Sequence, residues 1–511
     1  MPIQRREMIK ASVAAGLAPA VGVGVGAGGA FGGVGRTAPP PDCRLGRLTD
    51  RDLASLSRSM VEGGRLVFPT SKDYDTVRLI WNETVEALPL AIARPRGPQD
   101  VSAVIGWCRE RGITPRLRSG GHSFAGYSTG ESLVIDLREM TDITYETDGT
   151  VTLAAGGLLG EVGRRLYCDA GLTIPMGTCP TVGLSGLTMA GGLGYHVRSH
   201  GLTIDRLKSA TVVLADGSVI ETDETRDADL FWALRGGGMG SYGVVTAWRF
   251  DPIPAKAQSL VSVRWAPTDF VEMMEAYQTW LGTLPPIGFA SATFITEPNG
   301  SVNAGVVMLD EGDGTNLLPL AEQLISLATR PSTGPPSLHP VAAPDCMAED
   351  EFSVDAGFRK SRYAMTPVGS DTLALIRDGF LKRASNPDLA GTKAFLLMDA
   401  GGGLIDTVAP TDTAFYHRNA LFCGQFGAVW NGVADPALAG AASESWLREL
   451  YDGVVPGVDG GCYPGYWDAE IVDWPSLYYG ENFPRLVQTK AAYDPENFFR
   501  FQRSIPLAAD G

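Results

Sequence analysis

Two glycine-rich stretches constrain the fold of this chain more than any other feature of its sequence. RSGGHSFAGY (118–127) ends an apolar segment that reads as a strand, and GTCPTVGLSGLTMAGGLG (177–194) follows further along the chain. Consecutive glycines let backbone N–H groups approach an anion closely. Neither stretch fits the Rossmann or the Walker pattern, so a dinucleotide pyrophosphate site and plain tight turns both stay open at this point.

Composition narrows the class of protein. The chain has 63 glycines in 511 residues, about 12% against a usual ~7%, without the Gly-X-Y period of collagen. A hydrophobic fraction of 44% and a charged fraction of 20% indicate an ordinary globular protein of about two to four domains. Its 42 Lys and Arg residues and 58 Asp and Glu residues give a net charge of −16, which makes nucleic acid an unfavourable partner.

The N-terminus has the pattern of an export signal. Arg5 and Arg6 precede a weakly apolar run of small residues over 11–31. This order predicts a bacterial secretory leader of the twin-arginine (Tat) type, with 1–41 as signal and linker and an exported product. A disordered tail is the alternative, and the many glycines argue against a stable membrane anchor.

The cysteines and histidines do not predict a metal site. Seven cysteines are widely scattered without a CxxC pair, so their spacing indicates neither a zinc knuckle nor a disulfide framework. His196 and His200 form H-x-x-x-H, but Val197 stands where a metalloprotease has glutamate. We therefore expect no bound metal.

The pattern of apolar residues predicts an α+β protein of two domains. The expected strands are 88–95, 113–121, 132–137, 151–157, 261–265, 290–296 and 303–309. The expected helices are Asp100–Arg111, capped at Asp100, Glu161–Ala170 and Phe270–Gly282. Residues 210–222 predict a hairpin that turns at Asp216-Gly217, and the proline-rich segment 330–344 predicts a loop.

Three long motifs occur in this order: RSGGHSFAGYS, GTCPTVGLSGLTMAGGLGYHVRSHGLTID and the C-terminal YYGENFPRLVQTKAAYDPENFF…QRSIP. Together they resemble the berberine bridge enzyme-like FAD-linked oxidases, which are flavoproteins of the vanillyl-alcohol oxidase type. The resemblance covers roughly 68–257 and 400–506. It implies a two-domain, PCMH-type FAD-binding fold with a substrate domain built on a large antiparallel sheet. The implied parts are an FAD-binding domain (42–258), a substrate domain (259–470) and a C-terminal segment (471–511) that returns to the first domain.

The resemblance also implies a doubly attached FAD. In many members a histidine bonds to the 8α carbon of the flavin and a cysteine to C6, and His122 and Cys179 match those positions. Imidazole and thiolate are nucleophiles suited to an electron-poor ring. The alternatives are a hydrogen-bonded loop histidine and a small buried cysteine.

Further cofactor contacts follow from the same motifs. By resemblance they are Arg118, Ser119, Gly120, Gly121, Ser123, Gly126, Tyr127, Val182, Gly183, Gly186, Gly191, Gly192, Gly194, Val245, Tyr479 and Asn482. Val182 corresponds to a position that governs oxygen access, where valine resembles the oxidase state. Ala190 departs from the three glycines that the family often shows.

The predicted catalytic residues are Tyr463 and Tyr466. Relatives carry Tyr-x-Asn-Tyr here, and this chain has Gly465 in place of the asparagine. A tyrosine with a depressed pKa can accept the proton of an alcohol. Because Gly401 stands where some relatives have a second base, with Asp399 two residues earlier, we expect a single base. Gln425 is a substrate-pocket candidate.

The implied function is oxidation of an alcohol of a natural product or sugar to a carbonyl, with hydride transfer to flavin N5 and reoxidation by O2 to give H2O2. Two alternatives remain open from the sequence. One is a carbon–carbon or ring-forming oxidase of the alkaloid type, and the other is a non-catalytic binding protein with a flavin fold. The oligomeric state has no signal in the sequence.

Overall fold

The computed structural model describes residues 49–344, 346 and 354–508. The leader predicted at 1–41 lies outside these residues.

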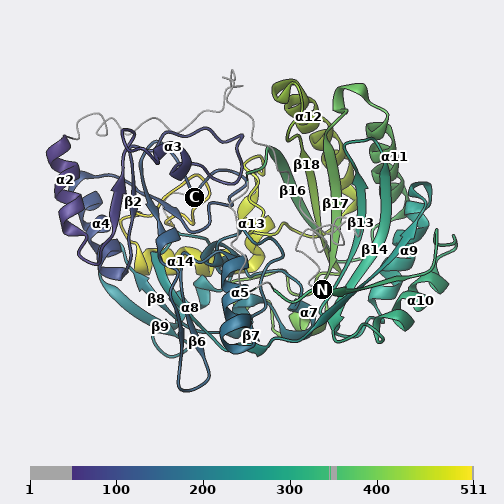
Figure 1. The fold of residues 1–511 in the computed structure, drawn as a ribbon, viewed down its shortest axis with the longest axis horizontal. Helices are drawn as coiled ribbons and strands as arrows, with labels where there is room; N and C mark the ends of the chain where they lie inside the picture. The colour runs from purple at the N-terminus through teal and green to yellow at the C-terminus, as the bar shows by residue number, and fades with distance from the viewer. Residues whose placement is uncertain (1–48, 345, 347–353, 509–511) are drawn as a thin grey trace.

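The first half of the chain builds two sheets, which lie on the left in Figure 1. A four-stranded sheet has the order β1-β2-β4-β3, and a five-stranded sheet has the order β5-β6-β10-β8-β9. Their strands are β1 Arg65–Val67, β2 Ala91–Arg94, β3 Arg116–Arg118, β4 Leu133–Asp136, β5 Ile143–Tyr145, β6 Val151–Ala154, β8 Leu207–Val213, β9 Val219–Asp223 and β10 Val244–Phe250. A small pair is formed by β7 Leu172–Thr173 and β11 Ile253–Pro254.

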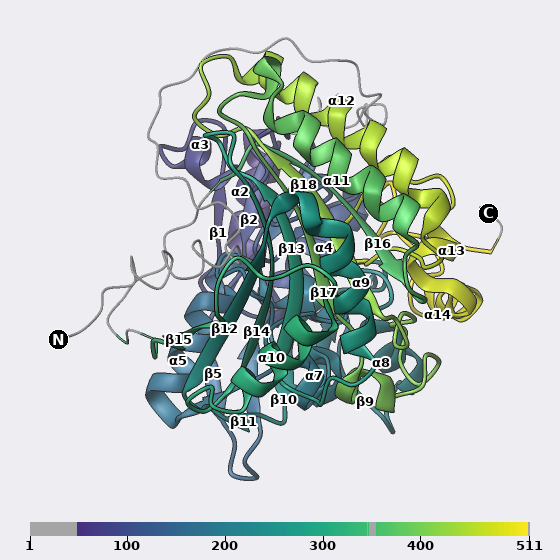
Figure 2. The ribbon, with the colours of Figure 1, turned by 90° about the vertical axis from the view of Figure 1, so that its right-hand side faces the viewer.

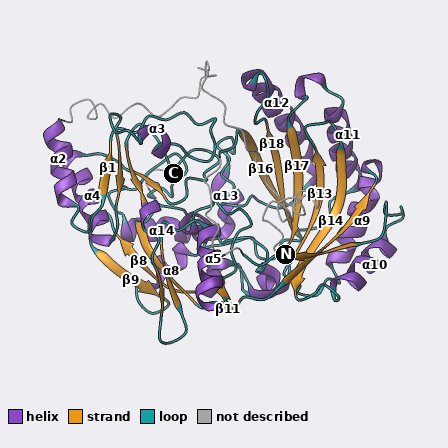
Figure 3. Cartoon of the chain, viewed as in Figure 1, coloured by secondary structure: helices purple, strands orange, loops and turns teal. Residues whose placement is uncertain are grey.

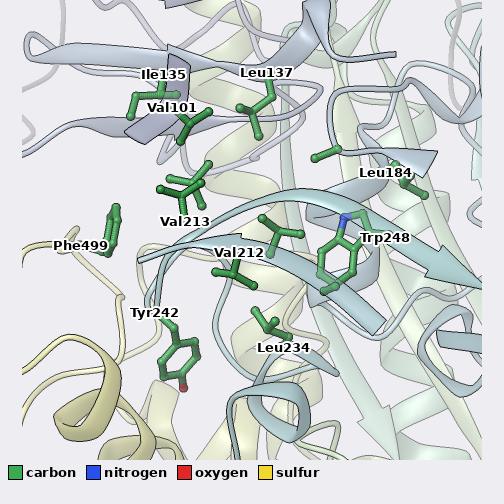
Figure 4. Close-up of a cluster of buried hydrophobic side chains, with 14 of the residues drawn as sticks. Val101, Ile135, Leu137, Leu184, Val212, Val213, Leu234, Tyr242, Trp248 and Phe499 are labelled. Carbon is green, nitrogen blue, oxygen red and sulfur yellow. The ribbon is translucent and has the colours of Figure 1, made fainter. Parts of the chain in front are cut away.

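Helices connect and cover these strands. They are α2 Asp50–Ser59, α3 Tyr74–Val77, α4 Pro98–Arg111, α5 Leu159–Ala170, α6 Leu184–Met189, α7 Val197–His200 and α8 Ala228–Leu234. Two helices near the C-terminus, α13 Trp474–Tyr479 and α14 Phe483–Tyr493, return to this half. Their residues Tyr478 and Leu486 belong to the same hydrophobic core as the five-stranded sheet. Figure 4 shows part of this core, with Trp248 and Val212 of that sheet.

The second half is a seven-stranded sheet in which every neighbouring pair is antiparallel, with the order β15-β12-β14-β13-β17-β18-β16. Its strands are β12 Gln258–Trp265, β13 Phe289–Thr296, β14 Val302–Glu311, β15 Ser337–Val341, β16 Gly357–Ala364, β17 Lys393–Ala400 and β18 Phe422–Val429. Four helices cover its outer face, as Figures 1 and 2 show, and Figure 3 separates the two layers by colour. They are α9 Phe270–Leu281, α10 Leu317–Leu327, α11 Ser370–Ala384 and α12 Pro436–Val454. The expected α+β class with a large antiparallel sheet is thus observed.

The side chains of each strand alternate between the two faces of the seven-stranded sheet. Leu396 and Met398 of β17 and Phe426 of β18 belong to the core beneath the helices. Successive side chains of a strand point to opposite faces. Phe395 and Leu397, which alternate with Leu396 and Met398, therefore point toward the first half of the chain.

Two expectations about local structure are wrong. Asp100 does not cap its helix, because α4 begins at Pro98 after Gly97, and the Asp100 carboxylate accepts hydrogen bonds from the backbone N–H groups of Glu62, Gly64 and Arg96. The proline-rich segment is not all loop, because it contains β15. That strand lies at the edge of the sheet. A proline such as Pro340, which has no backbone N–H to donate, is tolerated there because one side of the strand has no neighbouring strand.

The sequence showed no disulfide pairing, but the structure contains one. Cys168 in α5 is bonded to Cys346, at a sequence separation of 178 residues. The cysteines Cys108, Cys179, Cys423 and Cys462 are free.

Cys168→Ser is expected to lower the free energy of unfolding by about 2–5 kcal/mol, because the cross-link no longer restricts the unfolded chain. Thermal unfolding without reductant measures the loss. Dithiothreitol should lower the stability of the wild type similarly and leave the variant unchanged. Equal unfolding curves for oxidised wild type and variant would contradict the expectation.

Candidate functional site

A cavity lies between the glycine-rich stretches and the inner face of the seven-stranded sheet. Its empty volume is about 1870 Å³, open mouth included. Both glycine-rich stretches, the sheet and the segment 463–467 line it, so one bound molecule can contact both halves of the chain there.

The two glycine-rich stretches form one wall because their backbones pack directly on each other. A Cβ added at Gly120 would overlap the backbone nitrogen of Gly183, and a Cβ at Gly183 would overlap that of Gly120. Gly121 adopts a φ of +76°, which side chains rarely tolerate. Gly186 meets nothing within 4 Å on its Cβ side and lines the cavity. Some of these glycines therefore serve loop-to-loop packing, while Gly186 leaves open space.

His122 and Cys179 meet at this wall. The Nε2 atom of His122 lies 3.6 Å from the Sγ atom of Cys179 and 3.3 Å from the hydroxyl of Thr181. The His122 ring stacks on Trp81, with ring centroids 4.2 Å apart and planes 22° from parallel. Burial, aided by the positive charge of Arg359, lowers the pKa of His122 to about 3, so its imidazole is neutral. Burial raises the pKa of the Cys179 thiol.

The two predicted catalytic tyrosines have different surroundings. The hydroxyl oxygen of Tyr463 accepts hydrogen bonds from the backbone N–H groups of Gly192 (3.3 Å) and Leu193 (3.4 Å), and the residue is 3% exposed. Tyr466 is half-buried and stacks on Phe124, with centroids 5.5 Å apart. Burial raises the pKa of both phenols, which is opposite to the depressed pKa that the sequence led us to expect of a base.

Gly465 accounts for the position of Tyr463. A Cβ at Gly465 would overlap the Tyr463 ring. The glycine that replaces the family's asparagine thus lets this ring lie against the backbone between the two tyrosines.

The sheet contributes the opposite wall of the cavity. It consists of the apolar side chains Ile295, Phe395 and Leu397 and the polar side chains Gln425, Arg359 and Lys393. Of these six residues, only Gln425 is among the candidates predicted from the sequence. The others, and Trp81, lie in ordinary strand or loop patterns that carry no local signal of a site.

Asp399 lies on the same sheet face but lines a smaller neighbouring cavity with Cys423, Tyr363 and His417. Burial raises the pKa of Asp399 to about 6. Its charge raises the pKa of Tyr466 further, which places the two groups in electrostatic reach of each other.

Most predicted site residues line the main cavity. They are Arg118, Ser119, Gly120, Gly121, His122, Ser123, Tyr127, Cys179, Val182, Gly183, Gly186, Val245, Gln425, Tyr463 and Tyr466. Six predicted cofactor contacts are not among its lining residues: Gly126, Gly191, Gly192, Gly194, Tyr479 and Asn482.

The contacts of several of these predicted residues explain where they lie relative to the cavity. Asn482 donates to the backbone carbonyls of Pro410 and Thr413, and Tyr479 is fully buried in the core of the first half. Gly191 and Gly192 have positive φ and face Phe415 and Thr203. Arg118 lines the cavity, but its guanidinium donates to backbone carbonyls such as those of Val77 and Ser128, so it braces the loop.

The residues present fit FAD. Glycine backbones that leave open space, a neutral buried imidazole next to a thiol, and a long, mostly apolar cavity suit the pyrophosphate and the ring of this cofactor.

Comparison with known proteins agrees with this assignment. The family model described as FAD binding domain matches residues 89–223, and the model described as Berberine and berberine like matches residues 462–506. YgaK of Bacillus subtilis, described as an uncharacterised FAD-linked oxidoreductase, is 33% identical over 455 residues, or 87% of this chain and 97% of YgaK. The chitooligosaccharide oxidase of Gibberella zeae is 28% identical, over 82% of this chain and 87% of its own length.

Solved structures share the fold. Physcomitrella patens BBE-like 1 is 27% identical with a TM-score of 0.79, covering 89% of this chain and 99% of that one. Glucooligosaccharide oxidase from Acremonium strictum, described with a 6-S-cysteinyl, 8α-N1-histidyl FAD, is 24% identical with a TM-score of 0.79, covering 89% and 98%.

The chain belongs to the berberine bridge enzyme-like family of FAD-linked oxidoreductases. The resemblance, the PCMH-type fold and the binding of FAD by an oxidoreductase are thereby confirmed. The relatives include sugar oxidases, which supports FAD-dependent oxidase activity on a small molecule.

Among the helices of the described residues, none has the length and apolar character needed to cross a membrane.

Proposed function

We propose that the protein oxidises an alcohol group of a sugar or natural product to a carbonyl and passes the electrons to O2, with FAD bonded to both His122 and Cys179. The observation that carries this proposal is the 3.6 Å approach of His122 Nε2 to Cys179 Sγ inside a cavity that also contains Tyr466. The 8α carbon is the methyl group on C8 of the flavin benzene ring, and C6 lies two positions away on that ring. A histidine bonded to one carbon and a cysteine bonded to the other must therefore be neighbours.

When bound, FAD supplies a hydride acceptor. The alcohol loses its O–H proton to Tyr466 and its C–H hydrogen as hydride, and O2 takes up two electrons and two protons to give H2O2. Both tyrosines line the cavity, but the Tyr463 oxygen already accepts two backbone N–H groups, so Tyr466 is the one assigned the role of base. The apolar residues Phe395 and Leu397 limit water around the reacting carbon.

The proposed reaction is tested by measuring O2 consumption and H2O2 formation with a panel of mono- and oligosaccharides and hydroxylated natural products. Equal amounts of O2 consumed and H2O2 formed, together with anaerobic bleaching of the flavin by the same substrate, are expected. If the flavin stays oxidised with every alcohol tested, the oxidase proposal is refuted and a non-catalytic binding role remains.

We also propose that the protein is exported. The Cys168–Cys346 disulfide supports this, because structural disulfides persist in oxidising compartments. The protein should be found outside the cytoplasm in a fractionated native host, and retention in the cytoplasm would refute export.

A further inference from the structure

Two cationic side chains face the cavity from the sheet. Lys393 of β17 and Arg359 of β16 lie on either side of strand β18, where they pair with Val429 and Gly427, two residues apart. Both residues line the cavity and both are mostly buried, at 8% and 3% exposed.

Lys393 is under-satisfied compared with the other buried lysines. Its ammonium has one ion-pair contact, to Glu297 at 3.5 Å, and no hydrogen bond among the described residues. Lys360 by contrast contacts Asp468 at 2.7 Å and Glu470 at 2.8 Å, and Lys490 donates to Asp494 at 2.6 Å and to two backbone carbonyls. A buried ammonium normally has such close partners, so Lys393 has donor capacity left for a ligand.

Arg359 is also only loosely neutralised. Its Nη1 donates to the carbonyl of Ala428, while its Nη2 lies 3.8 Å from Asp355. The Asp355 carboxylate also binds Asn431, and burial raises the pKa of Asp355 to about 6, which weakens it as a counter-ion. The Arg359 guanidinium lies over the rings of Phe395 (4.9 Å) and Trp81 (5.3 Å), which hold it at the cavity wall.

The surroundings of Lys393 and Arg359 make these two cationic groups selective for an anionic ligand. The same wall also carries the apolar side chains Phe395 and Ile295 and the neutral amide Gln425. Charge contacts in such a partly desolvated site are stronger than at a surface.

We infer that Lys393 and Arg359 select an alcohol substrate that carries a carboxylate, which Lys393 binds by a charge-assisted hydrogen bond. This inference rests on the proposed oxidase function and narrows it to one substrate class. Lys393 then acts in substrate recognition and takes no part in proton or hydride transfer.

The test compares matched substrates on the flavin-loaded enzyme. Cellobiose and cellobiouronic acid, and galactose and galacturonic acid, differ by one carboxylate. We expect kcat/KM to favour the acid of at least one pair by about tenfold or more, since a hydrogen bond to a charged group is stronger than one between neutral groups. In Lys393→Gln this preference should fall by about tenfold, and Lys393→Arg should retain it.

Binding is measured separately by calorimetry with the flavin reduced beforehand, so that no turnover occurs. The Kd of the preferred acid should rise about tenfold in Lys393→Gln. Lys256→Gln is the matched control, because Lys256 pairs with Glu311 outside the cavity. It should leave both the preference and the Kd as in the wild type.

The outcomes separate this inference from the proposed function. No preference for the acid in kcat/KM or Kd, or a preference that survives in Lys393→Gln, overturns the inference even if neutral sugars are oxidised. Flavin that no alcohol reduces defeats the oxidase proposal, and the Kd comparison would still decide whether the cavity selects a carboxylate.

Discussion

Replacement of Tyr466 by phenylalanine is expected to lower kcat by about 10²–10⁴-fold, the usual contribution of a general base. Tyr466 lines the cavity and is held by stacking on Phe124. Phenylalanine keeps this stacking and removes only the group that accepts the alcohol proton. The loss should therefore appear in the rate of anaerobic flavin reduction, measured by stopped flow, with little change in thermal stability.

Two controls accompany this variant. Tyr145→Phe, at an exposed tyrosine whose hydroxyl contacts Asp169, should reduce its flavin at the wild-type rate. Tyr463→Phe removes the acceptor of the Gly192 and Leu193 N–H groups, so it should disturb the loop and show its effect partly in stability. Flavin reduction at the wild-type rate in Tyr466→Phe would contradict the assignment of the base.

The same assignment sets the sign of the pH dependence. A base must be deprotonated to act, and burial raises the pKa of Tyr466 above its ordinary value. The reactive phenolate fraction therefore grows as pH rises, and kcat/KM of the wild type should increase from neutral to alkaline pH. This increase should be absent in Tyr466→Phe, whereas a flat wild-type profile would count against a tyrosine base.

The second large effect concerns retention of the cofactor after denaturation. His122→Ala and Cys179→Ala should each keep flavin fluorescence in the protein band of a denaturing gel, because one bond remains in either variant. The double variant should lose it completely. The neighbouring positions of the two side chains, 3.6 Å apart, are the physical reason to expect both bonds on one ring.

Cys108→Ala is the matched control for this experiment. Cys108 is a free cysteine in the core of the first half, and burial raises its pKa to about 12, so it is unreactive. Its variant should keep the flavin. Wild-type protein that releases all its flavin on denaturation would refute covalent attachment altogether.

Local sequence was most informative where neighbours in the chain act together. The hairpin at Asp216-Gly217 formed as expected, with a φ of +84° at Gly217, because a turn depends on its own few residues. The motif at 118–127 likewise kept His122 at the cavity. Asp100 and segment 330–344 were misjudged because their hydrogen-bond partners, in the loop at 62–64 and in β12, are distant in sequence.

Three contiguous motifs carry the resemblance to the flavoprotein family and its FAD-side residues, and the periodicity of single segments predicts the α+β class, because both kinds of pattern lie in neighbouring residues. Folding in three dimensions is needed to show that backbone N–H groups occupy the Tyr463 oxygen, that Cys168 bonds to Cys346, and that Lys393 and Arg359 share one wall with Gln425. Strand register and burial bring these residues together from separate segments. The neighbours that neutralise their charges and accept their hydrogen bonds come together only when the sheet forms.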